Sequence, residues 1–174
     1  MPAASPALSS VPVAFDDAPL RAAMAEMPSA VTVITGWNTD GSPAGSTLSA
    51  VSSLSLDPPL MLACFHRDSR TLGALGVGRG FLIHVLAAGQ DDLAAVFAGK
   101  GDKFAQVAWE KGLLGMPQLP GCQTVIACEV AAHLPGGDHV IVTGAVRDIS
   151  HDAVRGVMLY HRRAFHALPQ PREA

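Results

Sequence analysis

The chain has 174 residues, of which 49% are apolar and 16% are charged, a composition that suits one globular domain with a buried core. Its formal net charge is −3, and its nine arginines and three lysines form no basic stripe, so a nucleic-acid partner is not expected. The longest uninterrupted apolar stretches, such as Leu60 to Phe65, fall far short of the roughly 18 residues that cross a bilayer. No membrane partner is expected either.

The chain opens with a stretch rich in Ala, Pro and Ser, and its first basic residue is Arg21. It therefore lacks the positively charged start of a secretory signal, which favours a cytoplasmic location. We expect a loose tail over residues 1–15, one domain over residues 16–168 and a C-terminal tail over residues 169–174. No internal repeat and no second domain are found.

Helical spacing and capping residues predict only short helices. The first starts at Asp16 or Asp17 and ends at Pro28, with Leu20, Ala23, Met24 and Met27 on one face. Ser69 can cap a second, and two more are expected over residues 91–98 and 104–111. Apolar and β-branched runs predict strands over residues 31–35, 45–56, 60–65, 81–86, 124–131, 139–146 and 157–161. Hairpin-length connections between most of them favour a mainly β fold, a closed antiparallel barrel with peripheral helices.

Small hydroxyl residues are concentrated in the segment STLSAVSSLSL, residues 46–56. On a period of two, Thr47, Ser49, Ser53 and Ser55 share one face of the expected strand. A solvated barrel exterior would give this pattern. The alternative is a row of hydroxyl donors that lines a polyol or a phosphate-bearing ligand.

Residues 66–71, HRDSRT, lie between a buried strand and an expected helix start. Unpaired N–H groups and the helix dipole favour an anion there. Arg70 adds a forked cationic donor, and Ser69 and Thr71 add hydroxyls. This predicts a phosphate clamp, whereas the alternative is simple capping by Ser69 beside exposed arginines.

Cysteine and histidine spacing argues against metal. Cys64, Cys122 and Cys128 are odd in number and show no CxxC pattern, so we expect free thiols in the core rather than disulfides or a zinc site. No histidines occur in HxH or HExxH spacing. The glycine run GALGVGRG follows a helix rather than a strand, so it is not a dinucleotide-binding fingerprint.

His139 follows the turn-forming residues 136–138 at the mouth of an expected strand. A histidine at a loop end beside a ligand pocket can donate hydrogen bonds or take protons. The alternative is an exposed turn histidine without a role.

Taken together, the chain resembles the short-chain flavin reductases, the reductase partners of two-component flavin-dependent monooxygenases. The resemblance runs in order from about Leu20 to Leu168, and SLDPPL and GDH are its most specific elements. It is carried by VTVIT, GSTLSAVSSLSLDPPLMLACF, DSRT, FLIHVLAAGQDDLAAVFAG, DKFAQVAWEKG, GGDHVIVTGAV and VMLYHRRAF.

The resemblance implies an FMN-binding split β-barrel, usually a homodimer, that transfers hydride from NADH or NADPH to FMN or FAD. Reduced flavin would then pass to a separate monooxygenase. His139 would lie near the nicotinamide, and backbone N–H groups near residues 49–53 would face the flavin edge where negative charge grows. The cofactor-binding residues implied are Ser46, Thr47, Leu48, Ser49, Ser52, Ser53, Cys64, Ser69, Arg70, Thr71, His84, Lys103 and Phe104.

His84 departs from the asparagine that the family commonly has at this position. An imidazole is bulkier than an amide and titrates near neutral pH. It would either retune flavin preference or potential, or only repack its surroundings.

Three rival functions share the barrel. A flavin carrier or redox-sensing module would be reduced once or not at all. An oxidase of the pyridoxamine-phosphate type would need a basic pocket for a second phosphate, and the three lysines form no local cluster. A plain structural dimer module would bind no flavin.

Overall fold

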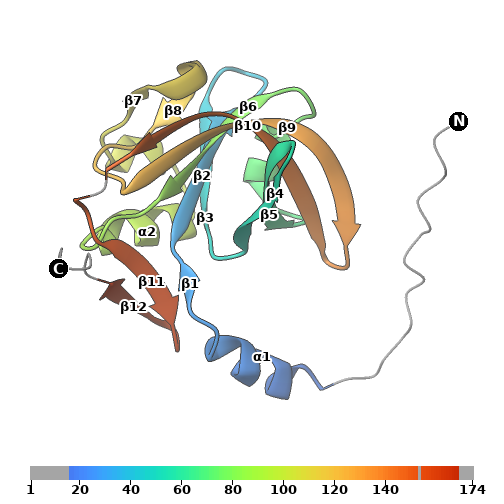
Figure 1. The fold of residues 1–174 in the computed structure, drawn as a ribbon, viewed down its shortest axis with the longest axis vertical. Helices are drawn as coiled ribbons and strands as arrows, with labels where there is room; N and C mark the ends of the chain where they lie inside the picture. Colours follow the sequence, from blue (N-terminus) through green and yellow to red (C-terminus); the bar gives the residue numbers. More distant parts are fainter. Residues whose placement is uncertain (1–15, 153, 169–174) are drawn as a thin grey trace, which may run out of the picture.

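The computed structural model describes residues 16–152 and 154–168. The two predicted tails, residues 1–15 and 169–174, lie outside the described residues. The fold is mainly β with antiparallel pairing, as predicted, and its helices are peripheral (Figure 1). None of the helices in the described part of the chain is long and apolar enough to cross a membrane.

The main sheet has seven strands, in the order β3-β2-β6-β9-β10-β5-β4. Their bounds are β2 Thr32–Trp37, β3 Pro43–Leu48, β4 Val51–Leu56, β5 Pro59–His66, β6 Gly80–Val85, β9 Thr124–Gly136 and β10 His139–His151. The two edge strands, β3 and β4, are consecutive in the chain and are joined only by Ser49 and Ala50. Three peptide steps reach at most about 11 Å. The sheet must therefore curl until its edges are neighbours, which gives the split barrel that the resemblance implied.

The single strand predicted over residues 45–56 is wrong. The chain leaves β3 at Leu48 and enters β4 at Val51 on the opposite edge of the sheet, while the Cys64 N–H donates to the Ala50 carbonyl (2.9 Å) at the crossing. The alternation of hydroxyls is interrupted there, because β3 pairs with β2 whereas β4 pairs with β5. The pattern of side chains could not reveal this change of partner.

Two apolar clusters hold the barrel together, and β6 separates them. Leu82 packs on the outer side against Phe97 of α2 (Asp91–Ala98), whereas Phe81 and Ile83 point into the barrel. Successive residues of a strand face opposite sides, so a strand buried on both faces is expected to be largely apolar. The run FLI in β6 meets that condition.

The remaining elements match the sequence unevenly. Those beside the barrel are α1 Asp17–Ala25, β1 Ser29–Ala30, η1 Arg70–Ala74, η2 Phe104–Gln106, β7 Glu110–Lys111, η3 Leu113–Gly115, β8 Pro117–Gln118, β11 Val157–His161 and β12 Ala164–Leu168. The helix from Asp16 is confirmed, since its carboxylate accepts from the Ala18 N–H (3.1 Å). The helix over residues 104–111 is wrong: residues 104–106 form a 3₁₀ turn, residues 107–109 are irregular, and Glu110–Lys111 pairs as β7 with β8.

Gly144 is required by packing at the centre of β10. A Cβ built on this glycine would lie 2.5 Å from Phe81 Cζ and 3.0 Å from Cys128 Cβ. Both neighbours are buried, so neither can move without disturbing the core. We expect Gly144→Ala to lower the free energy of unfolding by about 1–3 kcal/mol through overpacking. Urea unfolding measures this change. The matched control is Gly73→Ala, because a Cβ added at Gly73 meets nothing within 4 Å. Gly41→Ala is unsuitable, because Gly41 has a positive φ of 82°.

Candidate functional site

A cavity of about 1290 Å³ opens between β3, the end of β5, η1 and the loop that joins α2 to η2. Cavities that hold one small ligand usually measure about 300–1,000 Å³. This one therefore has room for more than one ring system. Most of the predicted site residues line it, namely Ser46, Thr47, Leu48, Ser49, Cys64, Ser69, Arg70, Thr71, Lys103, Phe104 and His139.

Three predicted site residues are not part of this lining. Ser52 and Ser53 lie exposed on the edge strand β4, where the Ser52 hydroxyl donates to the Ser53 carbonyl (3.1 Å). His84 is fully buried in β6. The crossing at Ser49 and Ala50 separates the serines of β4 from Ser46 and Thr47 of β3.

His84 is a structural histidine in this fold. Its Nδ1–H donates to the Val33 carbonyl (3.0 Å), and its Nε2 accepts from the Leu119 N–H (3.1 Å). Both partners are satisfied only by the neutral ring, since a carbonyl accepts and an N–H donates. Burial lowers the pKa of His84 to about 4, although the hydrogen bond to Val33 opposes the shift. The ring therefore joins β2 and β6 to the segment before β9.

Two cations face the middle of the cavity. Arg70 starts η1, and Lys103 precedes η2. The Lys103 ammonium donates to the Phe97 carbonyl (2.7 Å) and the Gly45 carbonyl (3.0 Å), which leaves one of its three N–H donors for a ligand. Burial first, and then the charge of Arg70, hold the pKa of Lys103 below its usual value. Within residues 16–152 and 154–168 neither cation pairs with a carboxylate.

A pair of hydroxyls lies in the same part of the cavity. Ser46 Oγ and Thr71 Oγ1 are 2.6 Å apart and link β3 to η1. We call Arg70, Lys103 and this hydroxyl pair the anion clamp. An anion bound there would relieve the repulsion between the two cations. The helix dipole invoked from the sequence contributes little, because η1 is a 3₁₀ helix of five residues.

His139 stands at the other end of the cavity, on the first residue of β10. Its Nδ1–H donates to the Asp138 carboxylate (2.7 Å), and this hydrogen bond lowers the pKa of Asp138. With Nδ1 engaged, the Nε2 atom is the one left to contact a ligand. The ring of His66, which is the register partner of His139 on β5, packs edge-on against it with centroids 5.4 Å apart.

The loop after β5 is tied to the turn that carries Asp138. The Arg67 N–H donates to the Asp138 carbonyl (3.0 Å), and the Arg67 guanidinium donates to the Gly137 carbonyl (3.2 Å). Arg67 lies three residues before Arg70 of the anion clamp. The same loop therefore positions both ends of the site.

Sequence reasoning did not assign to the site four ring residues that line the cavity, Phe65, His66, Phe97 and Trp109. His66 faces His139 only through the antiparallel register of β5 and β10, which no local pattern specifies. Trp109 lies in a segment that was expected to be helical. Its signal was its rarity, since the chain has two tryptophans, and large aromatic side chains outside regular elements often contact ligands.

The three cysteines are free thiols, and their environments differ. Burial raises the pKa of Cys122 and of Cys128 to about 12, whereas Cys64 is half-buried and lines the cavity. The thiolate is the reactive form. We therefore expect a native-state thiol titration to modify Cys64 alone, with Cys122 and Cys128 reacting only in denaturant. Cys64→Ser should abolish labelling of the native protein. In the unsubstituted protein, added FMN should slow the labelling of Cys64. Labelling of Cys122 in the native state would contradict the structure.

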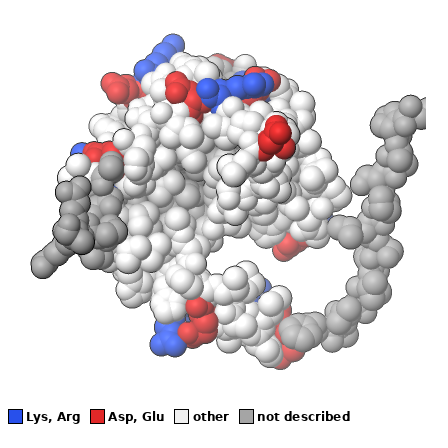
Figure 2. Space-filling model, viewed as in Figure 1, with Lys and Arg blue, Asp and Glu red and all other residues white. Residues whose placement is uncertain are grey.

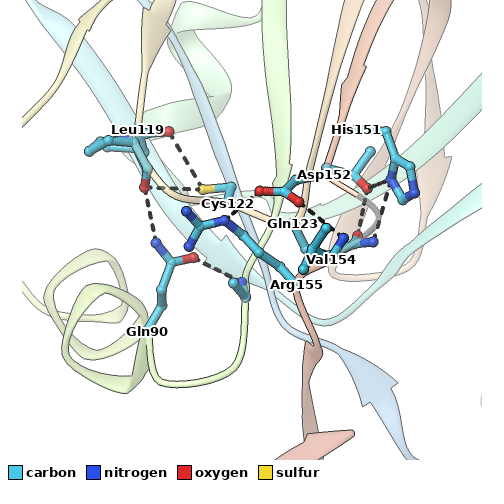
Figure 3. Close-up of polar contacts among 11 residues, drawn as sticks. Gln90, Leu119, Cys122, Gln123, His151, Asp152, Val154 and Arg155 are labelled. Carbon is cyan, nitrogen blue, oxygen red and sulfur yellow. Dashed lines mark hydrogen bonds and ion pairs between the residues drawn. The ribbon is translucent and has the colours of Figure 1, made fainter. Parts of the chain in front are cut away.

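A second cavity of about 320 Å³ lies beside the loop that precedes β9. Polar groups in and beside this cavity bind one another, as Figure 3 shows. The Gln90 amide accepts from the Ala87 N–H (2.9 Å) and donates to the Pro120 carbonyl (3.0 Å), while Arg155 donates to Asp152 (2.7 Å). The Asp152 N–H also donates to the Gln123 carbonyl (2.9 Å), which ties the link between β10 and β11 to the residue before β9. No three His, Cys, Asp or Glu side chains in the described parts of the chain are grouped as metal ligands.

Comparisons with known proteins identify the family of this chain. The flavin reductase like domain family matches residues 24–169. A protein from Kitasatospora aureofaciens described as flavin reductase (NADH) is 40% identical over 150 residues, which cover 84% of this chain and 78% of that protein. The flavin-dependent monooxygenase reductase subunit HsaB of Mycobacterium tuberculosis is 37% identical over 137 residues, which cover 78% of this chain and 73% of the relative.

The fold is shared with solved structures. The NADH:FAD oxidoreductase SgcE6 of Streptomyces globisporus C-1027, in complex with NAD and FAD fragments, aligns with a TM-score of 0.81 and 32% sequence identity over 87% of this chain and 92% of that one. The family match, over residues 24–169, includes every residue of the anion clamp as well as His139. This chain belongs to the flavin reductase-like family.

Proposed function

We propose that this chain is an NADH:flavin oxidoreductase that supplies reduced flavin to a separate flavin-dependent monooxygenase. The observation that carries the proposal is one cavity with an anion clamp in the middle and the His139–Asp138 pair at one end. A flavin phosphate fits the clamp, since two cations and a hydroxyl pair converge on it. The volume leaves space for a second flat ring beside the flavin.

The cofactors supply the hydride chemistry, which runs from nicotinamide C4 to flavin N5. The protein supplies placement, because a hydride moves only between rings held in close approach. Thr47 is fixed by its hydrogen bond to the Ala94 carbonyl (2.7 Å), which keeps the β3 wall of the cavity rigid. His139 orients the nicotinamide through its Nε2 atom, and Asp138 holds the ring by Nδ1.

Oxidation of NADH and NADPH, each with riboflavin, FMN and FAD, tests the function. In the absence of air, a reductase reduces many equivalents of added flavin per chain, and we expect this with NADH. A flavin carrier or redox sensor on the same barrel would stop after one equivalent. The absence of turnover with every flavin would overturn the proposal, and the same assay decides between NADH and NADPH.

His139→Ala tests the nicotinamide end of the cavity. Loss of one hydrogen bond, worth about 1.5 kcal/mol, should slow hydride transfer roughly tenfold and raise the KM for NADH. Stopped-flow absorbance at the flavin band measures the rate. His133→Ala is the control. His133 lies on the same β9–β10 hairpin as His139, but its ring contacts the Leu75 carbonyl (2.7 Å) and does not line the cavity. An unchanged rate and NADH affinity in His139→Ala would remove this residue from the site.

A homodimer is the expected assembly. None of the residues of α1 is buried, and Leu20 and Met24 expose 50% and 59% of their surface. The helix stands apart from the barrel in Figure 1, and the face shown in Figure 2 carries few charged side chains. A second copy would cover these apolar residues. Light scattering after gel filtration measures the mass of the assembly, which should be that of two chains.

The cytoplasmic location stays a prediction.

A further inference from the structure

The cavity continues past the anion clamp, on the side away from His139. Strand β3 runs along it, and Ser46 marks the clamp because its hydroxyl contacts Thr71. Ser49 and Pro43 lie three residues to either side of Ser46 and both line the cavity. At about 3.3 Å per residue, the lining extends roughly 10 Å in each direction from the clamp. Cys64 and His139 lie toward the Ser49 end, and the Pro43 end is the opposite end of the same cavity.

Trp109 dominates the Pro43 end. The ring of Trp109 is half-buried and packs edge-on against Phe104 (centroids 5.6 Å apart) and Trp37 (5.8 Å). Trp37 is the register partner of Pro43, which places Trp109 at that end. Two flanking rings hold the indole in place, so it can receive a ligand ring without first becoming ordered. We call Asn38, Ser42, Lys100 and Trp109, which all line the cavity, the Trp109 compartment.

We propose that the Trp109 compartment binds the adenosine half of FAD, so that FAD is the preferred flavin. The inference rests on the proposed function, which places the flavin phosphate in the anion clamp. FMN ends at its single phosphate and would leave the compartment empty. FAD carries a diphosphate, whose two charges match Arg70 and Lys103, and then continues into an adenosine.

The chemistry of the compartment suits an adenosine. Adenine stacks on aromatic faces, and an indole offers the largest such face in proteins. Asn38 and Ser42 supply polar groups for a ribose. They already contact each other, with the Asn38 amide donating to the Ser42 hydroxyl (3.0 Å), so their positions are set before a ligand arrives.

Dissociation constants of riboflavin, FMN and FAD, measured by flavin fluorescence for the full-length chain, test the inference. We expect the unsubstituted protein to bind FAD more tightly than FMN. Trp109→Leu should weaken FAD binding by about 5- to 150-fold, the range found for loss of base stacking on an aromatic ring, and should change FMN and riboflavin binding less than about twofold. Trp109→Phe should recover most of the FAD affinity.

Trp37→Phe is the matched control, because it alters a ring contact of Trp109 without removing a residue that lines the cavity. It should keep the preference for FAD. Equal binding of FMN and FAD by the unsubstituted protein, or equal losses for both in Trp109→Leu, would overturn the inference and leave the proposed function intact. A selective rise in the KM for NADH would also overturn it, since the compartment would then hold the nicotinamide dinucleotide. Failure to bind any flavin would overturn both.

Discussion

Replacing Arg70 with alanine is expected to weaken FMN binding by about 10- to 100-fold and to leave riboflavin binding within about twofold. Riboflavin has the same ring and ribityl chain but no phosphate, so the pair of ligands isolates the contribution of the anion clamp. A hydrogen bond to a charged group contributes about 1.5–3 kcal/mol, and 1.4 kcal/mol corresponds to a tenfold change in affinity. Isothermal titration of both ligands into both proteins measures the effect.

The structure explains why one cation cannot replace the other in the clamp. Lys103 is held by the Gly45 and Phe97 carbonyls, so its remaining N–H can make one contact. Arg70 is exposed at the start of η1 and offers a planar fork that binds two phosphate oxygens. We therefore expect Arg70→Lys to recover only part of the affinity.

Arg67→Ala is the matched control for Arg70. It removes an equal charge from the same loop, but the Arg67 guanidinium is directed to the Gly137 carbonyl and does not line the cavity. The ratio of FMN to riboflavin affinity should therefore stay unchanged in Arg67→Ala. Equal losses of this ratio in the two variants would mean that general positive charge, rather than the clamp, holds the phosphate.

The sequence predicted the local features of the site well. Arg70 and Thr71 of the anion clamp are predicted from local chemistry, a forked cation beside hydroxyls in residues 66–71, whereas Lys103 and Ser46 are implied only by the family resemblance. The turn before His139 was likewise visible in GGDH. The structure places these residues on the cavity, and their roles as a ligand site stay predictions.

The sequence could not specify contacts between distant segments. The pairing of His66 with His139 depends on strand register, and the break at Ser49 and Ala50 depends on closure of the barrel. Both follow from long-range packing, which periodicity does not record. His84 is the clearest case, because its partners Val33 and Leu119 lie far from it in the chain.

The second large effect concerns His84 and the stability of the fold at acid pH. The pKa of His84 is lowered from 6.5 to about 4 in the folded state, so the unfolded chain binds the proton more readily. Stability from the neutral ring is fully present above pH 6.5 and is lost as the pH falls toward 4. At about 1.4 kcal/mol for each pH unit, the free energy of unfolding should drop by about 3 kcal/mol across this window.

His84→Asn, which installs the residue common in the family, removes the titrating group. The shorter amide can still meet the Val33 carbonyl but leaves the Leu119 N–H unpaired, which should cost about 1–3 kcal/mol at pH 7.5. Because only the unsubstituted protein then loses the His84 contribution, the two stabilities should converge as the pH falls from 6.5 to 4. Urea unfolding at a series of pH values measures both curves. The exposed His166 provides the control. The free energy of unfolding of His166→Asn should depend on pH in the same way as that of the unsubstituted protein. The same pH dependence in His84→Asn would show that His84 does not titrate between these pH values.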